Sequence, residues 1–179
     1  MIKRFSIALI CLAVLAMSFV LIQNWNIAPS NTVTFKITAM VGNVNGSIGG
    51  LKGTVSFDPQ DLKGSNLDVS LDVSSIKTGN GKRDKDIMAE TWFNTTQYPT
   101  ITFKSNGISK TTSGYNVDGT LTIKGVAKKA QIPFTFAQSP DGGTFTGTLH
   151  LNRLDYGVGK ETKMVGNDVD VVITVPVKK

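Results

Sequence analysis

The residues able to do acid–base or nucleophilic chemistry are few, and their spacing supports neither. His150 is the single histidine of the chain, and it alternates between Leu149 and Leu151 as an outward residue of a predicted strand. A zinc site or a histidine-based catalytic triad requires partners that this lone residue lacks. We therefore expect His150 on the surface, with no catalytic or metal-binding role.

Paired carboxylates occur twice, and neither pair predicts general acid–base catalysis. Asp84 and Asp86 lie within the charged run 82–86, whose alternating signs indicate a salt-bridged turn. Asp168 and Asp170 alternate along the last predicted strand, which places both on its outer, solvated face. The sequence therefore predicts a protein that is not an enzyme.

Thiol chemistry and nucleic-acid binding are also excluded. The only cysteine, Cys11, lies inside the N-terminal apolar run 5–22, so the folded part has no thiol for a disulfide, a metal or a nucleophile. The formal net charge is +6, but the lysines are scattered singly. A nucleic-acid surface would gather them in a stripe.

Apolar residues instead follow a period of two, which is typical of half-buried strands. With no helical period between the runs, this pattern predicts an antiparallel all-β fold. Segment 25–30 is expected to be a polar connector, and segment 42–53, with five glycines and two asparagines, a hairpin. The predicted strands cover residues 32–38, 51–57, 66–74, 100–104, 115–124, 130–136, 145–151 and 169–175.

Eight such strands can close as a sandwich or as an up-and-down barrel. Glycines at the inward positions 53, 119 and 147 favour the barrel, because barrel strands must bend at corners. An eight-stranded barrel is wide enough either to be filled by its own side chains or to hold one small elongated ligand. Both outcomes stay open on the residues alone.

The inward side chains are almost entirely apolar, so such a lumen would accept an apolar molecule. The residues predicted to line it are Phe35, Ile37, Val55, Phe57, Leu71, Ile101, Phe103, Leu121, Phe134, Phe136, Phe145 and Leu149.

One long stretch, residues 75–105, does not alternate, and a connection of this length is usually functional or a cap. We expect a loop with a short helix over one end of the barrel. Arg83 and Asp84 are predicted to pin it by charge-assisted hydrogen bonds, with Trp92, Phe93 and Tyr98 as its apolar underside. The alternative is a surface loop that fills the end of the core.

The N-terminus has the pattern of an export signal. Residues 1–4 are positively charged, and 5–22 form an apolar run of a length that could also stay in a membrane as an anchor. The expected division is a signal peptide or membrane anchor over 1–22, a linker over 23–31 and a barrel domain over 32–179.

The segment SSIKTGNGKRDKDIMAETWFNTTQYPTITFKS resembles the signature region of the YceI-like family of polyisoprenoid-binding, lipocalin-like barrel proteins. Further matches are residues 118–126, 152–159 and 168–175. Arg153 and Tyr156 join the mouth of the barrel on this resemblance. Asp86 and Ala39 stand where family members often have histidines, so a headgroup contact made by those histidines would be lost here.

The resemblance implies a periplasmic protein, free or anchored to the inner membrane through residues 1–22, with no cofactor and no catalytic activity. Its lumen would bind a long isoprenoid lipid, such as a quinone tail or a polyprenyl phosphate, for transport, storage or sequestration in the bacterial envelope. The alternative is an envelope interaction module with a filled barrel. A homodimer stays open.

Overall fold

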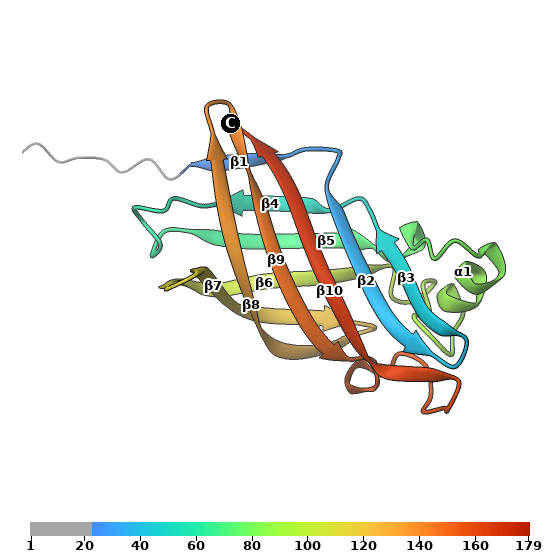
Figure 1. Ribbon diagram of the computed structural model, residues 1–179. Helices are drawn as coiled ribbons and strands as arrows, with labels where there is room; N and C mark the ends of the chain where they lie inside the picture. Colours follow the sequence, from blue (N-terminus) through green and yellow to red (C-terminus); the bar gives the residue numbers. More distant parts are fainter. Residues whose placement is uncertain (1–22) are drawn as a thin grey trace, which may run out of the picture.

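The computed structural model describes residues 23–179, so the predicted signal or anchor over 1–22 lies outside the described part. The described residues form one antiparallel sheet of ten strands, with one α-helix and two short 3-10 helices (Figure 1). The strands are β1 (Asn24–Ile27), β2 (Thr32–Ala39), β3 (Gly42–Ile48), β4 (Lys52–Ser56), β5 (Asn66–Asp72), β6 (Thr100–Thr111), β7 (Gly114–Ile123), β8 (Val126–Ser139), β9 (Gly142–Asn152) and β10 (Val165–Lys178). The helices are η1 (Val73–Ser75), α1 (Gly81–Met88) and η2 (Arg153–Tyr156).

The sheet closes on itself because β1 pairs with both β4 and β10. Along one edge of β10, β1 pairs with residues 177–178 and β2 with residues 165–174, so β1 and β2 form one interrupted strand. β3 and β4 form the next interrupted strand, paired with β2 and β1. Counted this way the barrel has eight strands, and the predicted eight-stranded antiparallel barrel is confirmed.

The predicted linker over 23–31 is wrong in its first part, because residues 24–27 are β1. Trp25 is buried, and its indole Nε1 donates a hydrogen bond to the carbonyl of Phe57 at 2.8 Å. Four residues are too few to show a period of two, so the sequence pattern could not reveal this strand. Its stability comes from pairing with two neighbours at once.

The predicted hairpin over 42–53 is also corrected, since most of it is β3. The turn before β3 lies at Met40 and Val41, between the paired residues Ala39 and Gly42. A Cβ at Gly46 would collide with the ring of Phe35, so this glycine makes room for an inward aromatic side chain. A glycine inside a strand can therefore mark close approach rather than a turn.

Two other boundaries differ for local reasons. The predicted strand 100–104 is longer in the structure, where β6 continues to Thr111. The sequence pattern ended early because a register shift between Ser105 and Gly107 interrupts the alternation. β10 continues past Pro176 to Lys178. The carbonyl of Pro176 accepts a hydrogen bond from the N–H of Ala28, which lies in the break between β1 and β2. Proline has no N–H, and at this position an N–H would point toward the same break, so the sheet loses no strand-to-strand hydrogen bond.

Aromatic side chains fill the end of the barrel near β1. The ring of Phe57, which is fully buried, meets four others edge-on at centroid distances of 5.1 to 5.6 Å. We call this the aromatic cluster, and its members are Trp25, Phe57, Tyr115, Phe134, Phe136 and Phe145.

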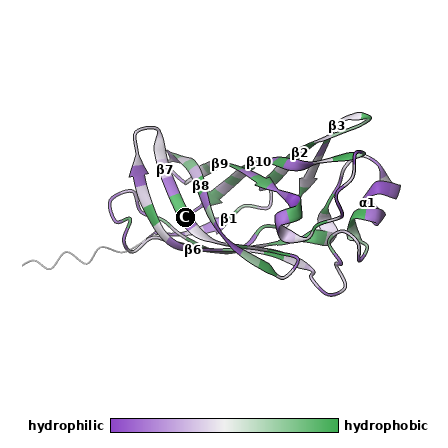
Figure 2. Cartoon of the chain, turned by 90° about the horizontal axis from the view of Figure 1, so that it is seen from below, coloured by the Kyte–Doolittle hydropathy of each residue, from purple (hydrophilic) through white to green (hydrophobic). Residues whose placement is uncertain are grey.

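The opposite end is covered by residues 73–99, which we call the cap. The cap contains α1, which is largely hydrophilic, whereas the barrel strands mix hydrophobic and hydrophilic residues (Figure 2). Val73 and Ile76 are almost fully buried and pack with Ile48 of β3 in a second, smaller core. The cap is therefore held to the barrel by apolar contacts as well as by polar ones.

Replacing Trp25 by alanine tests the contribution of β1. We expect Trp25→Ala to lower the free energy of unfolding by about 3–5 kcal/mol, because it removes a large buried side chain and leaves a cavity. Asn26→Ala, at an exposed position of the same strand, should change it by less than about 0.5 kcal/mol. Urea denaturation of the two variants measures both, and equal effects would show that β1 is not part of the cooperative core.

Candidate functional site

Two adjoining cavities lie in the part of the barrel that the aromatic cluster does not fill. The inner cavity has a volume of about 180 Å³ and the outer cavity about 310 Å³. They are two parts of one lumen because they share six lining residues, namely Val33, Ile48, Ile101, Ile123, Leu151 and Val171.

Every residue that lines the inner cavity is apolar, and the rings of Phe134 and Phe145 form its floor. A Cβ at Gly119 would collide with the ring of Phe103, so this inward glycine also makes room for an aromatic side chain. Eight of the twelve predicted lumen residues lie here, namely Val55, Leu71, Ile101, Phe103, Leu121, Phe134, Phe145 and Leu149.

The other four predicted lumen residues divide between the two ends. Phe35 and Ile37 line the outer cavity. Phe57 and Phe136 belong to the aromatic cluster, where edge-to-face packing with neighbouring rings occupies the space. Side chains therefore fill one end of the barrel, and the lumen occupies the rest.

The outer cavity lies between the β2–β3 hairpin and the cap. Ile37 and Val44 line the hairpin side, and Trp92 and Phe93 of the cap lie opposite them, as the sequence predicts for the two aromatic residues. Most of the remaining lining is apolar, and it includes four polar or charged side chains, namely Arg83, Asp86, Arg153 and Tyr156. Polar groups thus gather at the mouth and leave the depth of the lumen apolar.

Hydrogen bonds to Thr78 fix the conformation of the cap itself, since Thr78, Arg83 and Asp84 all belong to it. Its N–H and its hydroxyl both donate to a carboxylate oxygen of Asp84, at 2.9 and 2.6 Å. Arg83 donates from Nε to the Thr78 hydroxyl oxygen and from Nη2 to the Thr78 carbonyl, both at 2.8 Å. The two residues therefore pin the loop by charge-assisted hydrogen bonds, as predicted, although the sequence pattern did not reveal Thr78 as their shared partner.

Asp84 lies in α1 of the cap, and its side chain is buried. The hydrogen bond from the Thr78 side chain holds the pKa of Asp84 below its usual value, and this outweighs the opposing effect of burial. Asn80 begins α1, accepting hydrogen bonds from the N–H groups of Lys82 and Arg83. The first turn of α1 thus directs Arg83 and Asp84 back onto Thr78.

Two sets of hydrogen bonds join the cap to the barrel. Lys77 and Ser47 exchange backbone hydrogen bonds of 2.8 and 2.9 Å. Lys124, in the turn between β7 and β8, donates from Nζ to the carbonyls of Glu90, Thr91 and Gly157, at 2.9 to 3.3 Å. Sequence reasoning did not select Lys124, and only its place before Gly125 marked it as a turn residue.

Arg153 is only 3% exposed, and carbonyl oxygens rather than a carboxylate satisfy its guanidinium group. Burial lowers the pKa of Arg153, and Trp92 lies over its charge with 5.3 Å between the guanidinium carbon and the ring centroid. Arg153 thus ties one loop together while lining the mouth. Its acceptors are the carbonyls of Val158, Lys160, Val165 and Gly166 and the side chain of Asn167.

The two tyrosines predicted at the mouth take different places. Tyr156 is buried and lines the outer cavity, and this burial raises the pKa of its hydroxyl. Tyr98 lies instead against Gly125, where its ring would collide with an added Cβ. Tyr98 therefore packs the cap onto the β7–β8 turn, and the predicted apolar underside consists of Trp92 and Phe93 with Ile76 and Ile87.

Some lining residues carried a sequence signal that the candidate list did not use, because Ile123, Leu151 and Val171 fall on the inward face of predicted strands. Others carried none. Val44 and Ile48 lie in the glycine-rich segment interpreted as a hairpin, and Ile76 and Ile87 lie in the cap, where no period of two exists.

The titratable side chains that line the lumen, Arg83, Asp86, Arg153 and Tyr156, all belong to the outer cavity. Within residues 23–179, no group of three or more His, Cys, Asp or Glu side chains is placed to hold a metal ion. His150 is exposed on the outer face, and its Nδ1 lies 2.7 Å from a carboxylate oxygen of Asp170, a contact that raises the pKa of His150. In the same part of the chain no helix is long and apolar enough to cross a membrane.

A closed eight-stranded antiparallel barrel with an apolar lumen and a pinned cap defines a lipocalin-like binding fold. The YceI-like domain model matches residues 25–177, and the chain belongs to the YceI-like family. The sequence-based identification of the family is thereby confirmed.

Several relatives agree with this membership. A UPF0312 protein of Azotobacter vinelandii is 30% identical over 151 residues, covering 80% of this chain and 79% of the relative. The crystal structure of Burkholderia cenocepacia BcnA is 29% identical, with a TM-score of 0.77 over 83% of this chain and 96% of that one. A polyisoprenoid binding domain from Saccharophagus degradans, implicated in plant cell wall breakdown, shares the fold at 15% identity and a TM-score of 0.65, covering 88% of this chain and 98% of that one.

The pinning of the cap can be tested by replacing Asp84 with alanine. At neutral pH we expect Asp84→Ala to increase amide hydrogen exchange throughout residues 73–99 by at least about tenfold, because Thr78 loses its charged acceptor. Exchange in β7 to β9 should be unchanged. Asp86→Ala, an exposed position on the same helix, is the matched control and should leave the cap protected.

The pH dependence of the same experiment has a defined sign. The pKa of Asp84 is lower in the folded protein than in the unfolded chain, where it is about 3.9. The contribution of Asp84 to the stability of the cap is therefore fully present above the unfolded pKa, and it is lost as the pH falls through the folded pKa. The protection of residues 73–99 from hydrogen exchange in the unsubstituted protein should therefore fall to that of Asp84→Ala only when the pH is below both pKa values. A difference that persists unchanged in acid would contradict the assigned role.

Proposed function

We propose that the protein binds the chain of a long isoprenoid lipid in its lumen and that it does so without catalysis. The observation that carries this proposal is the continuous apolar lumen, open to polar groups only at its mouth. Family membership and the polyisoprenoid binding domain that shares this fold support the same class of ligand.

The energetics of such binding require few polar contacts. Each methylene group moved from water into an apolar site contributes about 0.8 kcal/mol, so a long hydrocarbon chain binds through burial alone. The outer cavity is in the size range of ordinary ligand sites, which starts at about 300 Å³, and the inner cavity extends it.

The mouth is where a headgroup would lie, and its polar groups favour a headgroup that accepts hydrogen bonds. Arg83 of α1 and Arg153 of η2 both line the outer cavity, and so does one carboxylate, that of Asp86. A quinone or a polyprenyl phosphate has suitable acceptor oxygens. The tail is the shared requirement, and the headgroup is the part that experiment must identify.

The place of action that we propose is the bacterial envelope. The positively charged start and the apolar run over residues 5–22 support export, either into the periplasm or to the periplasmic face of the inner membrane. Transport, storage or sequestration of the lipid there are the roles that a non-enzymatic carrier could fulfil.

Native mass spectrometry of the protein, purified from its membranes under gentle extraction, tests the proposal directly. We expect an adduct whose mass corresponds to an isoprenoid quinone or a polyprenyl phosphate. Tandem fragmentation should separate the two, because only the second releases phosphate. A protein that consistently shows no bound lipid, or only purification detergent, would contradict the proposal.

A matched pair of substitutions locates the ligand. Val171 lines both cavities, and the adjacent Val172 is exposed on the outer face. We expect Val171→Trp to lower the amount of bound lipid by about tenfold or more, because the indole occupies the lumen. Val172→Trp should leave it within about twofold, and equal lipid content in both folded variants would place the ligand outside the lumen.

A further inference from the structure

Two tight turns at the mouth end of the barrel expose large apolar side chains. Met40 and Val41 form the turn between the paired residues Ala39 and Gly42, and they are 69% and 83% exposed. Met164, which is 53% exposed, lies in the turn between the paired residues Thr162 and Val165. Such turn positions normally carry Gly, Asn, Asp, Ser or Pro, so the fold itself does not require these residues.

The two turns form one surface, which we call the tip and define as Met40, Val41 and Met164. The N–H of Met40 donates to the carbonyl of Met164 at 2.9 Å, which joins the two turns. Three of the five large hydrophobic residues reported as exposed in the described part of the chain lie in this tip. Single exposed apolar residues are ordinary, whereas a cluster indicates an interaction site.

The tip continues directly into the apolar lining of the lumen. Ile37 and Val44 flank the first turn and Val165 follows the second, and all three line the outer cavity. Apolar surface therefore extends from the exposed tip into the interior of the barrel.

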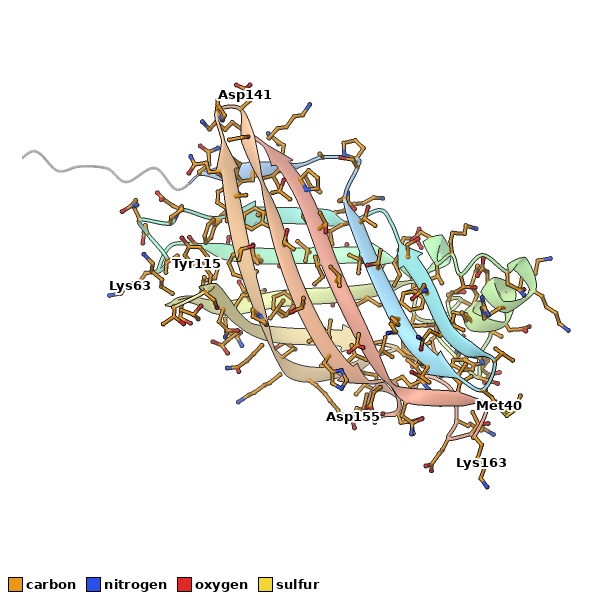
Figure 3. The ribbon with its side chains drawn as sticks, viewed as in Figure 1. Met40, Lys63, Tyr115, Asp141, Asp155 and Lys163 are labelled. Atoms are coloured by element: carbon orange, nitrogen blue, oxygen red, sulfur yellow. The ribbon has the colours of Figure 1, made fainter. Side chains whose placement is uncertain are left out.

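The turn that carries Met164 is mainly positive in charge. In residues 160–165 the charged side chains are Lys160, Lys163 and Glu161, and all three are exposed, whereas Lys36 of β2 pairs with Asp170 of β10. Met40 and Lys163 lie at the same end of the barrel, and Asp141 at the opposite end (Figure 3). Apolar residues at the centre with lysines around them suit the boundary between hydrocarbon and anionic headgroups.

The size of the tip favours a bilayer over a protein partner. A stable protein–protein interface buries about 800 Å² on each side, which three side chains at the end of two turns do not supply. Shallow insertion into a membrane needs no such area. Methionine is also flexible enough to adapt to a disordered lipid surface.

We propose that the tip inserts into the interface of an anionic lipid bilayer and so places the mouth of the lumen against the membrane. The proposal rests on the exposed turns and their charge, and it holds whether or not the lumen carries an isoprenoid.

A site-specific probe tests it in the full chain. Val41→Cys in a Cys11→Ser background gives one thiol for an environment-sensitive fluorophore, and Val172→Cys in the same background is the control. With vesicles of phosphatidylethanolamine and phosphatidylglycerol, we expect a blue shift and quenching by brominated acyl chains at position 41 but not at 172. Vesicles of phosphatidylcholine alone should give a weaker response.

The label separates docking at the tip from attachment through residues 1–22. Asn24 pairs at the opposite end of the barrel from Met40, so attachment there does not bring position 41 to the lipid. The vesicles contain no isoprenoid, so the result does not depend on the proposed ligand. The proposal is overturned if the emission of the label at position 41 does not change when vesicles are added. It is also overturned if the emission shifts only with protein concentration, because that would indicate contact with a second copy of the protein.

A second variant checks which side chains are responsible. With the label moved to Lys163→Cys, we expect replacement of Met40, Val41 and Met164 by serine to raise the lipid concentration at half-maximal shift by at least about tenfold, since each methylene withdrawn from hydrocarbon contributes roughly fourfold. Unchanged circular dichroism would show that the barrel still folds. An unaltered titration would contradict the assignment.

Discussion

The structure depends on how a single sheet closes on itself, because every unpaired edge of a barrel must find hydrogen-bond partners. At the end near β1 closure is complete, since β1 pairs with both β4 and β10. At the other end β3 has no strand beyond it in the described part of the sheet, and its edge pairs with Lys77 of the cap. The cap therefore completes the wall of the barrel as well as covering its end.

This difference between the two ends explains where the lumen lies. Near β1 the inward residues are aromatic, and their edge-to-face contacts fill the interior with a buried cluster around Phe57. Toward the cap the inward residues are mainly Val, Ile and Leu, whose shorter side chains do not reach across the barrel. Tight packing at one end thus coexists with a lumen at the other.

The parts of the fold that follow a period of two could be predicted from sequence, and the parts held by pairing alone could not. Alternation placed Phe103, Leu121 and Leu149 inward, and all three line the inner cavity. It failed for β1, which is too short to show a pattern. It also failed for β3, where Gly46 leaves space for the ring of Phe35 and does not form a turn.

The candidate site shows the same limit. Residue chemistry indicated that Arg83 and Asp84 would form charge-assisted bonds, yet their common partner Thr78 carries no distinguishing signal in the sequence. Tyr98 had the right residue type for the mouth, but its N–H donates to the carbonyl of Asn94 and its ring packs against Gly125 of the β7–β8 turn. Long-range geometry of this kind is not encoded in local spacing.

Two buried charges, Asp84 in the signature segment and Arg153 in η2, have a structural explanation. Asp84 accepts from Thr78, and Arg153 donates to carbonyl oxygens, so each buried charge is satisfied by uncharged partners on the backbone or a nearby side chain. The charges of the cap and of the loop after β9 hold the backbone in place, and the apolar side chains that they position form the surface of the lumen.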